Sequence, residues 1–329
     1  MRRYRVYGYT LATDHPLTSF LTPSEAEADL VFVCRRSAEE APASQQLVYR
    51  SVLPGIGDES LFSFYRLGDD AFRLYYPGTA DFVIGRHHIE CRLFDPQYAY
   101  WVEIALLGPV LSLWLEFRGS ITLHASGVVE AEQAVGFIAN SKSGKSSLAA
   151  SYMAGGAALL ADDILPLHRS DAGQIVARPA FPQLRMWPDE VRVFAGDPSG
   201  FPFAHPAYDK RRIPAAVVGR YHDEPVPLGA LCMPERARPD ECTDVTVSRI
   251  GGLEALMLLL QSSFVASVLE HMPEMKVRRL SLVADLLHTV PVYRLVYPHG
   301  FEHLPAVRAR IAGVLAGTAD GNEPALHSS

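Results

Sequence analysis

The stretch AVGFIANSKSGKSSLAASYMAGGAALLADDILPL, residues 134–167, decides the fold of this 329-residue chain. Its first apolar run, Ala134–Ile138, is suited to a buried strand, and Ala157–Ala161 is a second run of the same kind. Between them, a turn rich in serine, lysine and glycine is followed by Ser146–Met153, which can form a helix that ends at a glycine pair. The pattern predicts a strand, a turn, a helix and a second strand.

The turn before this helix has the composition of a phosphate-binding loop. The first backbone N–H groups of a helix have no intrahelical partner, and the helix dipole adds positive potential at the same place. Lys145 can reach nucleotide phosphates and the Ser146 hydroxyl can bind Mg²⁺. The residues predicted to bind the nucleotide are Asn140, Ser141, Lys142, Ser143, Gly144, Lys145, Ser146 and Ser147.

The loop departs from the P-loop pattern at one position. The pattern requires Gly, four residues, Gly-Lys, and then Ser or Thr, and this chain has Ala139 in place of the leading Gly. Because alanine disfavours positive φ, we expect the loop entry to differ slightly or to be strained.

Two carboxylates end the second strand of this stretch. We expect that strand to lie beside the strand that leads into the loop, which would bring Asp162 and Asp163 to the phosphate site. One carboxylate could then bind Mg²⁺, while the other accepts the proton of an attacking hydroxyl. Two like charges in one cleft also raise one pKa, which suits a base. The alternative is a solvated acidic turn.

A histidine precedes the loop strand. His124 lies in residues 121–129, predicted as a strand that turns at residues 130–133 into the loop strand. Such a hairpin could bring His124 beside the loop. The alternative is a hydrogen-bonded core histidine.

Composition excludes several classes of protein. The chain is 48% hydrophobic and 20% charged, an ordinary globular balance with enough length for two domains. The net charge of −7 and the lack of a Lys/Arg-rich block argue against a nucleic-acid partner. The four cysteines contain no CxxC pair, so we expect free thiols in a reducing cytosol.

No segment predicts a membrane partner. Residues 4–13 are not a continuous apolar signal segment, and the most apolar run, Ile104–Leu115, is too short to cross a bilayer. We interpret that run as a buried helix kinked at Gly108-Pro109, and we expect a cytoplasmic protein.

The first hundred residues predict a β-rich domain without catalytic spacing. Six short runs rich in β-branched and aromatic residues are separated by turns: 4–9, 30–34, 46–50, 61–65, 72–76 and 81–85. We predict residues 1–100 as a recognition module, 101–316 as a P-loop catalytic domain and 317–329 as a flexible tail.

The remaining segments are predicted to form the walls of the site. Arg185, in the strand candidate 183–186, could reach phosphate or form a surface salt bridge. Residues 197–214 carry Lys210, Arg211 and Arg212, and suggest either a mobile lid or a solvated loop. Helices are expected at 253–269, 277–288 and 304–315, and further strands at 175–178, 226–233 and 292–297.

His124, the ANSKSGKS loop and the LLADD strand end together resemble the catalytic core of the HPr serine kinase family. In that family the three features occur in this order. In most other P-loop enzymes, the metal-binding acidic residue at the end of a later strand lies much further along the chain from the loop. The resemblance covers residues 120–168 and, more weakly, 181–188 and 209–212. It implies an α/β fold with a P-loop core of the HPr kinase/phosphoenolpyruvate carboxykinase type.

The resemblance implies an ATP- and Mg²⁺-dependent serine kinase that acts on a small protein or peptide. The chain looks more like the stand-alone HPr-kinase-like proteins of peptide-modification clusters than like true HPr kinases, and these include lasso peptide kinases that phosphorylate a precursor's terminal serine. Lys145 and Ser146 would hold the phosphates and Mg²⁺, with Asp162 as a second metal ligand. Asp162 or Asp163 would activate the acceptor hydroxyl, and His124 would orient the surroundings of the γ-phosphate.

Two other functions stay open from the sequence. One is a P-loop kinase of a small hydroxylated metabolite, and the other is a nucleotide-binding regulator without transfer activity. The regulator is favoured if Ala139 distorts the loop. The oligomeric state, a homo-oligomer included, is also open.

Overall fold

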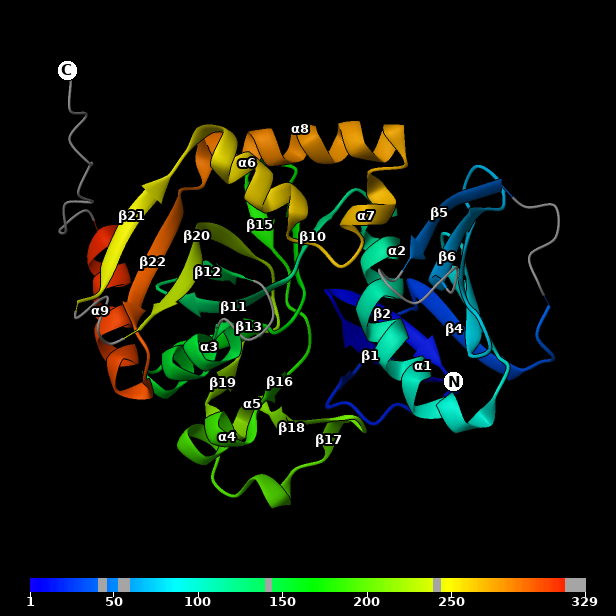
Figure 1. The fold of residues 1–329 in the computed structure, drawn as a ribbon, viewed down its shortest axis with the longest axis horizontal. Coiled ribbons are helices and arrows are strands. Elements are labelled where there is room, and N and C mark those ends of the chain that lie inside the picture. Colours follow the sequence, from blue (N-terminus) through cyan, green and yellow to red (C-terminus); the bar gives the residue numbers. More distant parts are fainter. Residues whose placement is uncertain (41–45, 53–59, 140–143, 239–243, 317–329) are drawn as a thin grey trace. The chain divides into compact units, whose positions relative to one another are not determined.

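The computed structural model describes residues 1–40, 46–52, 60–139, 144–238 and 244–316. The chain has a mixed α/β architecture with large sheets (Figure 1). It divides into two compact units: unit 1 contains Met1–Thr122 and Phe264–Leu280, and unit 2 contains Leu123–Ser263 and Ser281–Ser329. The predicted boundary at residue 100 therefore falls inside unit 1. The predicted tail, 317–329, lies outside the described residues.

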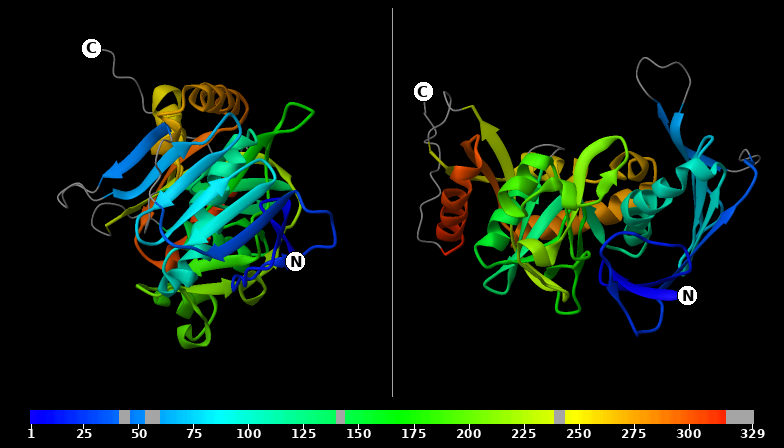
Figure 2. Two further views of the ribbon diagram at one scale, coloured as in Figure 1. Left: turned by 90° about the vertical axis from the view of Figure 1, so that its right-hand side faces the viewer. Right: turned by 90° about the horizontal axis from the view of Figure 1, so that it is seen from below.

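Unit 1 is built on a nine-stranded sheet in the order β3-β1-β2-β4-β9-β8-β7-β6-β5. The blue and cyan strands of this sheet are seen in the left view of Figure 2. Strands β2, β4 and β9 are parallel neighbours, and the other pairs are antiparallel. The strands are β1 (Arg2–Val6), β2 (Tyr9–Thr13), β3 (Thr22–Pro23), β4 (Leu30–Arg36), β5 (Gln46–Val52), β6 (Ser60–Arg66), β7 (Phe72–Tyr76), β8 (Ala80–Ile84) and β9 (His88–Leu93).

The prediction of a β-rich first hundred residues is confirmed, with one run misassigned. The last five predicted runs lie in β4 to β8, but residues 4–9 do not form one strand. The chain reverses at Tyr7 and Gly8, whose φ angles are 55° and 76°, so that β1 and β2 form a hairpin. A pattern of alternating side chains does not reveal such a turn, because Gly8 supplies the conformation without disturbing the alternation.

An apolar helical segment follows the sheet. It comprises η1 (Pro96–Tyr98), α1 (Ala99–Ala105), the π-turn η2 (Leu106–Val110) and α2 (Leu111–Phe117). The predicted kink is confirmed, because Gly108 has the non-helical angles φ −104° and ψ −113° just before Pro109.

This segment, Pro96–Phe117, is longer than the apolar run seen in the sequence. Its 22 residues are long and apolar enough to cross a membrane by length and composition alone, although the run Ile104–Leu115, on which the expectation rested, is shorter. Of its most apolar window, 61% is buried within the protein, and the core helix of a globular domain has the same property.

Unit 2 contains most of a ten-stranded sheet in the order β10-β14-β15-β20-β12-β11-β13-β19, to which β22 and β21 are added at β20. The strands are β10 (Ile121–Leu123), β11 (Ala125–Glu130), β12 (Gln133–Ile138), β13 (Ala158–Ala161), β14 (Leu165–Arg169), β15 (Ile175–Ala177), β19 (Arg220–Tyr221), β20 (Val226–Ala237), β21 (Thr246–Ile250) and β22 (Val292–Pro298). A separate small sheet has the order β16 (Gln183–Met186), β18 (Tyr208–Pro214), β17 (Phe203–His205).

The hairpin that leads into the loop is confirmed, but the expected neighbour of the loop strand is wrong. Strands β11 and β12 are antiparallel and turn at Ala131 and Glu132, both with positive φ. The strand that ends at Asp162 is β13, which pairs with β11 and not with the loop strand β12. Because the other edge of β12 is occupied by β20 in parallel, no edge of the loop strand is left for β13.

The remaining helices are α3 (Lys145–Ala154), α4 (Pro188–Phe194), α5 (Ala215–Val218), α6 (Gly252–Gln261), α7 (Ala266–Leu269), α8 (Pro273–Thr289) and α9 (Leu304–Leu315), with 3₁₀ turns η3 (Pro198–Gly200) and η4 (Phe301–His303). The single helix predicted at 253–269 is divided into α6 and α7. The sequence analysis did not predict strands β3, β9, β14, β17, β18, β19 and β21 or helices α4 and α5.

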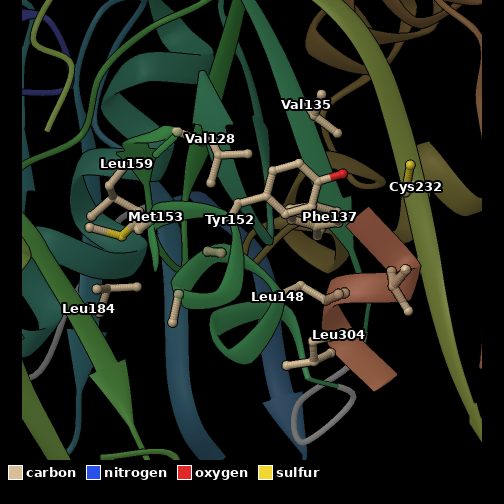
Figure 3. Close-up of a cluster of buried hydrophobic side chains, with 14 of the residues drawn as sticks. Val128, Val135, Phe137, Leu148, Tyr152, Met153, Leu159, Leu184, Cys232 and Leu304 are labelled. Atoms are coloured by element: carbon tan, nitrogen blue, oxygen red, sulfur yellow. The ribbon is translucent and has the colours of Figure 1, made fainter. Parts of the chain in front are cut away.

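Helix α3 is held against the sheet by a buried apolar cluster. Figure 3 shows Leu148 and Tyr152 of α3 beside Phe137 of the loop strand, and the rings of Phe137 and Tyr152 have centroids 5.4 Å apart. Burial of each such side chain contributes about 1.5–3 kcal/mol. The cluster therefore fixes the start of α3 relative to the end of β12.

Residues 197–214, predicted as a lid or a loop, contain paired strands. Strand β18 pairs with both β16 and β17, so its backbone is held on both sides. The cations Lys210, Arg211 and Arg212 therefore lie on a central strand of a small sheet. The free thiols predicted at Cys34, Cys91 and Cys232 are confirmed, and Cys242 lies outside the described residues.

Candidate active site

The site is organised around the first turn of α3. Gly144 precedes the helix with φ 91°, in the left-handed region that glycine tolerates best, and Lys145 is the first helical residue. The predicted nucleotide-binding residues Gly144, Lys145, Ser146 and Ser147 thus surround the amino end of this helix. The predicted residues Asn140, Ser141, Lys142 and Ser143 lie outside the described part of the chain.

Lys145 and His124 are in contact. The Lys145 ammonium donates to the carbonyl of Ala139 at 2.6 Å and lies 3.3 Å from His124 Nε2. Lys145 is only 6% exposed, and this burial lowers the pKa of its ammonium. Burial, and next the Lys145 charge, lower the pKa of His124. The expected proximity of His124 to the loop is therefore confirmed.

His124 does not lie within a continuous strand. The predicted strand 121–129 is interrupted at His124, between β10 and β11. Its Nδ1 lies 3.0 Å from the carbonyl oxygen of Asp163, and its backbone N–H donates to the carbonyl of Ser262. Because Nδ1 faces a carbonyl acceptor, it carries the proton in the neutral ring, and Nε2 is left to accept from Lys145.

Asp162 is buried and accepts three hydrogen bonds. Its Oδ1 accepts from Ser126 Oγ at 2.6 Å and from Ser146 Oγ at 3.0 Å, and its Oδ2 accepts from the backbone N–H of Arg185 at 2.7 Å. The side chain is 5% exposed. Burial, and next the charge of Asp163, raise the pKa of Asp162 to about 6.

Asp163 has the opposite electrostatic environment. Its backbone has φ 72°, a left-handed conformation that turns the chain after β13, and its Oδ2 lies 2.8 Å from Arg185 Nη1. Burial alone would raise the pKa of Asp163, but Arg185, Lys210 and the neighbouring cations outweigh it and hold the pKa below its usual value. The two adjacent carboxyls therefore differ in pKa and in partners, which a solvated acidic turn would not show.

The four predicted cations have different surroundings. Arg185 pairs with Asp163, and Lys210 lies over the Trp187 ring at 5.6 Å from its centroid. Arg211 stacks on Phe203 with its guanidinium carbon 3.6 Å from the ring centroid. Arg212 lies opposite Arg185 in the register of β16 and β18. Of these four, Lys210 alone lines the cavity described next.

A cavity of about 370 Å³ opens over the first turn of α3, entirely within unit 2. Six residues considered in the sequence analysis line it: His124, Gly144, Lys145, Ser146, Asp163 and Lys210. Six more were not assigned there: Trp187, Asp189, Glu190, Arg236, His299 and Phe301. The cavity therefore joins the helix start, the end of β13 and the small sheet in one concave site of a size that suits a ligand.

Two residues that the sequence analysis did not assign, Glu190 and Arg236, contact the start of α3. Glu190, in the first turn of α4, accepts from the Ser147 hydroxyl and from the backbone N–H of Trp187. Arg236 Nη2 donates to Ser147 Oγ at 3.3 Å, and a Cβ added to Gly144 would lie 2.2 Å from Arg236 Nη2. Strand β20 brings Arg236 to the loop because it runs parallel to β12. The sequence contains no sign of that pairing.

The oxygen atoms beside α3 fit a magnesium ion that also binds phosphate. In the described part of the chain, no group of three or more His, Cys, Asp or Glu side chains could hold a metal by itself. The Ser146 hydroxyl and the Asp162 carboxylate are 3.0 Å apart, and both are hard oxygen donors. Mg²⁺ commonly uses one or two protein oxygens together with phosphate oxygens and water, so these two donors are sufficient.

Comparisons with known proteins add little to this geometry. No family model matches the sequence, and no curated protein matches it. A structural comparison finds the HPr(Ser) kinase/phosphatase from Coxiella burnetii, with 11% sequence identity and a TM-score of 0.34. The alignment covers 60% of this chain and 99% of the Coxiella chain. A TM-score of this size does not establish a shared fold. The function is therefore inferred from the site itself.

Proposed function

We propose that this protein transfers the γ-phosphate of ATP to a serine hydroxyl of a small protein or peptide. The proposal rests on the contrast between two adjacent carboxyls, Asp162 and Asp163, which follow β13 and lie beside the first turn of α3. Asp162 is buried and bonded to Ser146, whereas Asp163 lines the cavity beside His124 and Lys145. Such a pair can divide the tasks of binding a metal and accepting a proton.

The phosphate side of the site consists of Gly144, Lys145 and the amino end of α3. Lys145 and Lys210 supply cations to the cavity, and Arg236 adds a third from the end of β20. Ser146 and Asp162 would hold Mg²⁺, which when bound neutralises charge on the phosphate oxygens. This placement of cations around an anion site favours transfer mainly by positioning and charge neutralisation.

Asp163 is the better candidate for the acceptor side. In the proposed reaction the serine oxygen bonds to the γ-phosphorus, the bond from that phosphorus to the bridging oxygen of ADP breaks, and the hydroxyl proton goes to Asp163. By pKa alone Asp162 would be the stronger base, because its pKa is raised and that of Asp163 is lowered. Position favours Asp163, which lines the cavity as an ionised carboxylate oriented by Arg185, whereas Asp162 is bonded to Ser146 behind it. His124 positions the same segment through the Asp163 carbonyl.

The identity of the acceptor is a finer proposal. The resemblance of His124, the loop and the Ala-Asp-Asp strand end to HPr-kinase-like proteins supports a peptide acceptor, with the serine of a lasso peptide precursor as the first candidate. Use of ATP by such an enzyme implies a cytoplasmic location.

The test is incubation with Mg-ATP and serine-bearing peptides, a lasso-type precursor included, followed by intact-mass measurement. A gain of one phosphate that is absent with Lys145→Met and with a Ser-to-Ala peptide supports the proposal. Transfer to small hydroxylated metabolites but not to any peptide would identify a metabolite kinase. Nucleotide binding without transfer to either would identify a regulator and overturn the proposal.

A further inference from the structure

Unit 1 contains two adjacent cavities that are separate from the phosphate site. One has a volume of about 400 Å³ and the other about 380 Å³, and both include Arg66 and Glu274 in their walls. All of their lining residues belong to unit 1. We propose that the two cavities form one groove that binds an extended peptide segment, with acidic residues at one end and apolar residues at the other.

The larger cavity presents arginines on an aromatic floor. The guanidinium carbon of Arg118 lies 5.0 Å from the Trp114 ring centroid, and that of Arg66 lies 5.5 Å from the Phe72 centroid. Phe72 in turn stacks on Phe117 with centroids 4.1 Å apart. An arginine held over a ring face has fewer conformations to lose when it binds a carboxylate.

These arginines are available to a ligand. Within the described part of the chain, neither Arg66, Arg86 nor Arg118 forms an ion pair with a carboxylate, although all three line the larger cavity. Arg86 and Arg118 are exposed and Arg66 is half-buried. A carboxylate would supply the acceptor that the planar guanidinium groups lack.

The cavity also contains acids, so its charge has to be weighed. Arg278 is a fourth arginine in the lining and donates to the carbonyl oxygens of Glu116 and Phe117. Against the four arginines stand Asp69, Asp70 and Glu274, all exposed to solvent. The four arginines exceed the three acids by one positive charge, and Arg66 and Arg118 are oriented by the rings beneath them, so the floor of the cavity favours an anion.

The smaller cavity adds apolar side chains to a wall that is otherwise polar. Leu47 and Val48 of β5 and Pro273 line it together with Gln46, Arg66, His271 and Glu274, and Leu47 is 45% exposed. Strand β5 is the last strand of the nine-stranded sheet, and no described strand pairs with its outer edge. The His271 ring lies 5.0 Å from the Tyr49 ring and forms part of the same wall.

An extended peptide fits these features better than other ligands. The net charge of −7 opposes nucleic acid, and a compact anion would occupy the arginine end without the Leu47 end. A peptide with acidic and apolar halves engages both ends at once. The inference does not depend on the proposed phosphate transfer, because it concerns binding in unit 1 alone.

The test uses a fluorescein-labelled octapeptide, one half leucine and valine and the other half glutamate, with the full-length protein, no nucleotide and low salt. A control peptide carries glutamine in place of each glutamate. We expect saturable binding of the acidic peptide and about tenfold weaker binding of the amide peptide. Hydrogen exchange of residues 46–51 and 66–72 should slow when the acidic peptide is bound.

Variants locate the binding. Arg118→Gln and Arg66→Gln should each weaken the acidic peptide about three- to tenfold and leave the amide peptide unchanged. Arg36→Gln removes the same charge from an exposed position of β4 outside the groove and serves as the matched control. No binding of the acidic peptide, equal binding of both peptides, or an equal loss in Arg36→Gln would each overturn the proposal.

Discussion

The Lys145 ammonium lies 3.3 Å from Nε2 of His124, whose Nδ1 is 3.0 Å from the carbonyl oxygen of Asp163. This chain of contacts joins the loop, the β10–β11 break and the end of β13 through one imidazole. Burial, and next the Lys145 charge, lower the pKa of His124, whereas burial is the main cause that lowers the pKa of Lys145. His124 is therefore neutral at neutral pH and acts as an acceptor for Lys145.

Replacing Lys145 tests this contact and the phosphate site together. Lys145→Met should lower the transfer rate at least about a hundredfold, because the cation of the phosphate site is lost. The same change should raise the pKa of His124, since the Lys145 charge is its second cause of lowering after burial. Proton NMR of the ring measures that pKa, with His124→Gln used to assign the resonance. Unchanged turnover in Lys145→Met would show that Lys145 does not take part in phosphate transfer.

Substitution of Asp162 should impair nucleotide binding, whereas substitution of Asp163 should impair the transfer step. Asp162→Asn should weaken Mg-nucleotide binding about tenfold or more, because Asp162 bonds the Ser146 hydroxyl. Asp163→Asn should lower kcat by at least about a hundredfold and leave nucleotide affinity within about threefold. Calorimetry with Mg-ADP and single-turnover kinetics separate the two effects. The exposed Asp171→Asn is the control, and identical phenotypes for the two site variants would contradict the division of roles.

The titration of Asp162 has a defined direction. In the folded protein the pKa of Asp162 is about 6, against the ordinary value of 3.8 for an aspartic acid side chain, so between these values the folded state keeps a proton that the unfolded state loses. The contribution of Asp162 to the free energy of unfolding is therefore largest below about pH 3.8 and falls as the pH rises through about 6.

Carboxyl carbon NMR of the metal-free protein checks this titration, and Asp162→Asn identifies the signal. Because the Asp163 charge is the second cause of the shift after burial, Asp163→Asn should move the Asp162 midpoint to lower pH. A midpoint near 4 in the wild type would show that Asp162 is hydrated rather than buried.

Gly144 should be irreplaceable for a steric reason that another glycine lacks. Gly144→Ala and Gly156→Ala each place alanine at positive φ, 91° and 102°, and each should cost about 1 kcal/mol of unfolding free energy. A Cβ at Gly144 would also displace Arg236, whereas none of the neighbouring atoms approaches a Cβ at Gly156 within 4 Å. Gly144→Ala alone should therefore weaken nucleotide binding. Equal nucleotide affinity in the two variants would show that the contact between Gly144 and Arg236 does not contribute to nucleotide binding.

Local elements were predictable because their signals are short in range. The bounds of α9 and β16 agree with the periodic runs, and α3 begins one residue before the predicted start. The position of β13 was mistaken because apolar strands look alike: nothing in Ala158–Ala161 distinguishes pairing with β11 from pairing with β12. Residues 197–214 were mistaken because their strands are stabilised by β16, a partner distant in sequence.

The sequence by itself determined that a glycine-lysine-serine turn enters α3 and that two carboxylates follow the next strand, because these features depend on neighbours along the chain. Only the tertiary structure decided that Asp162 faces Ser146 while Asp163 faces Arg185 and the cavity. It also brought Glu190 and Arg236 to Ser147. The reason is physical: a pKa and a hydrogen-bond partner depend on burial and on the pairing of distant strands, which adjacency in sequence does not specify.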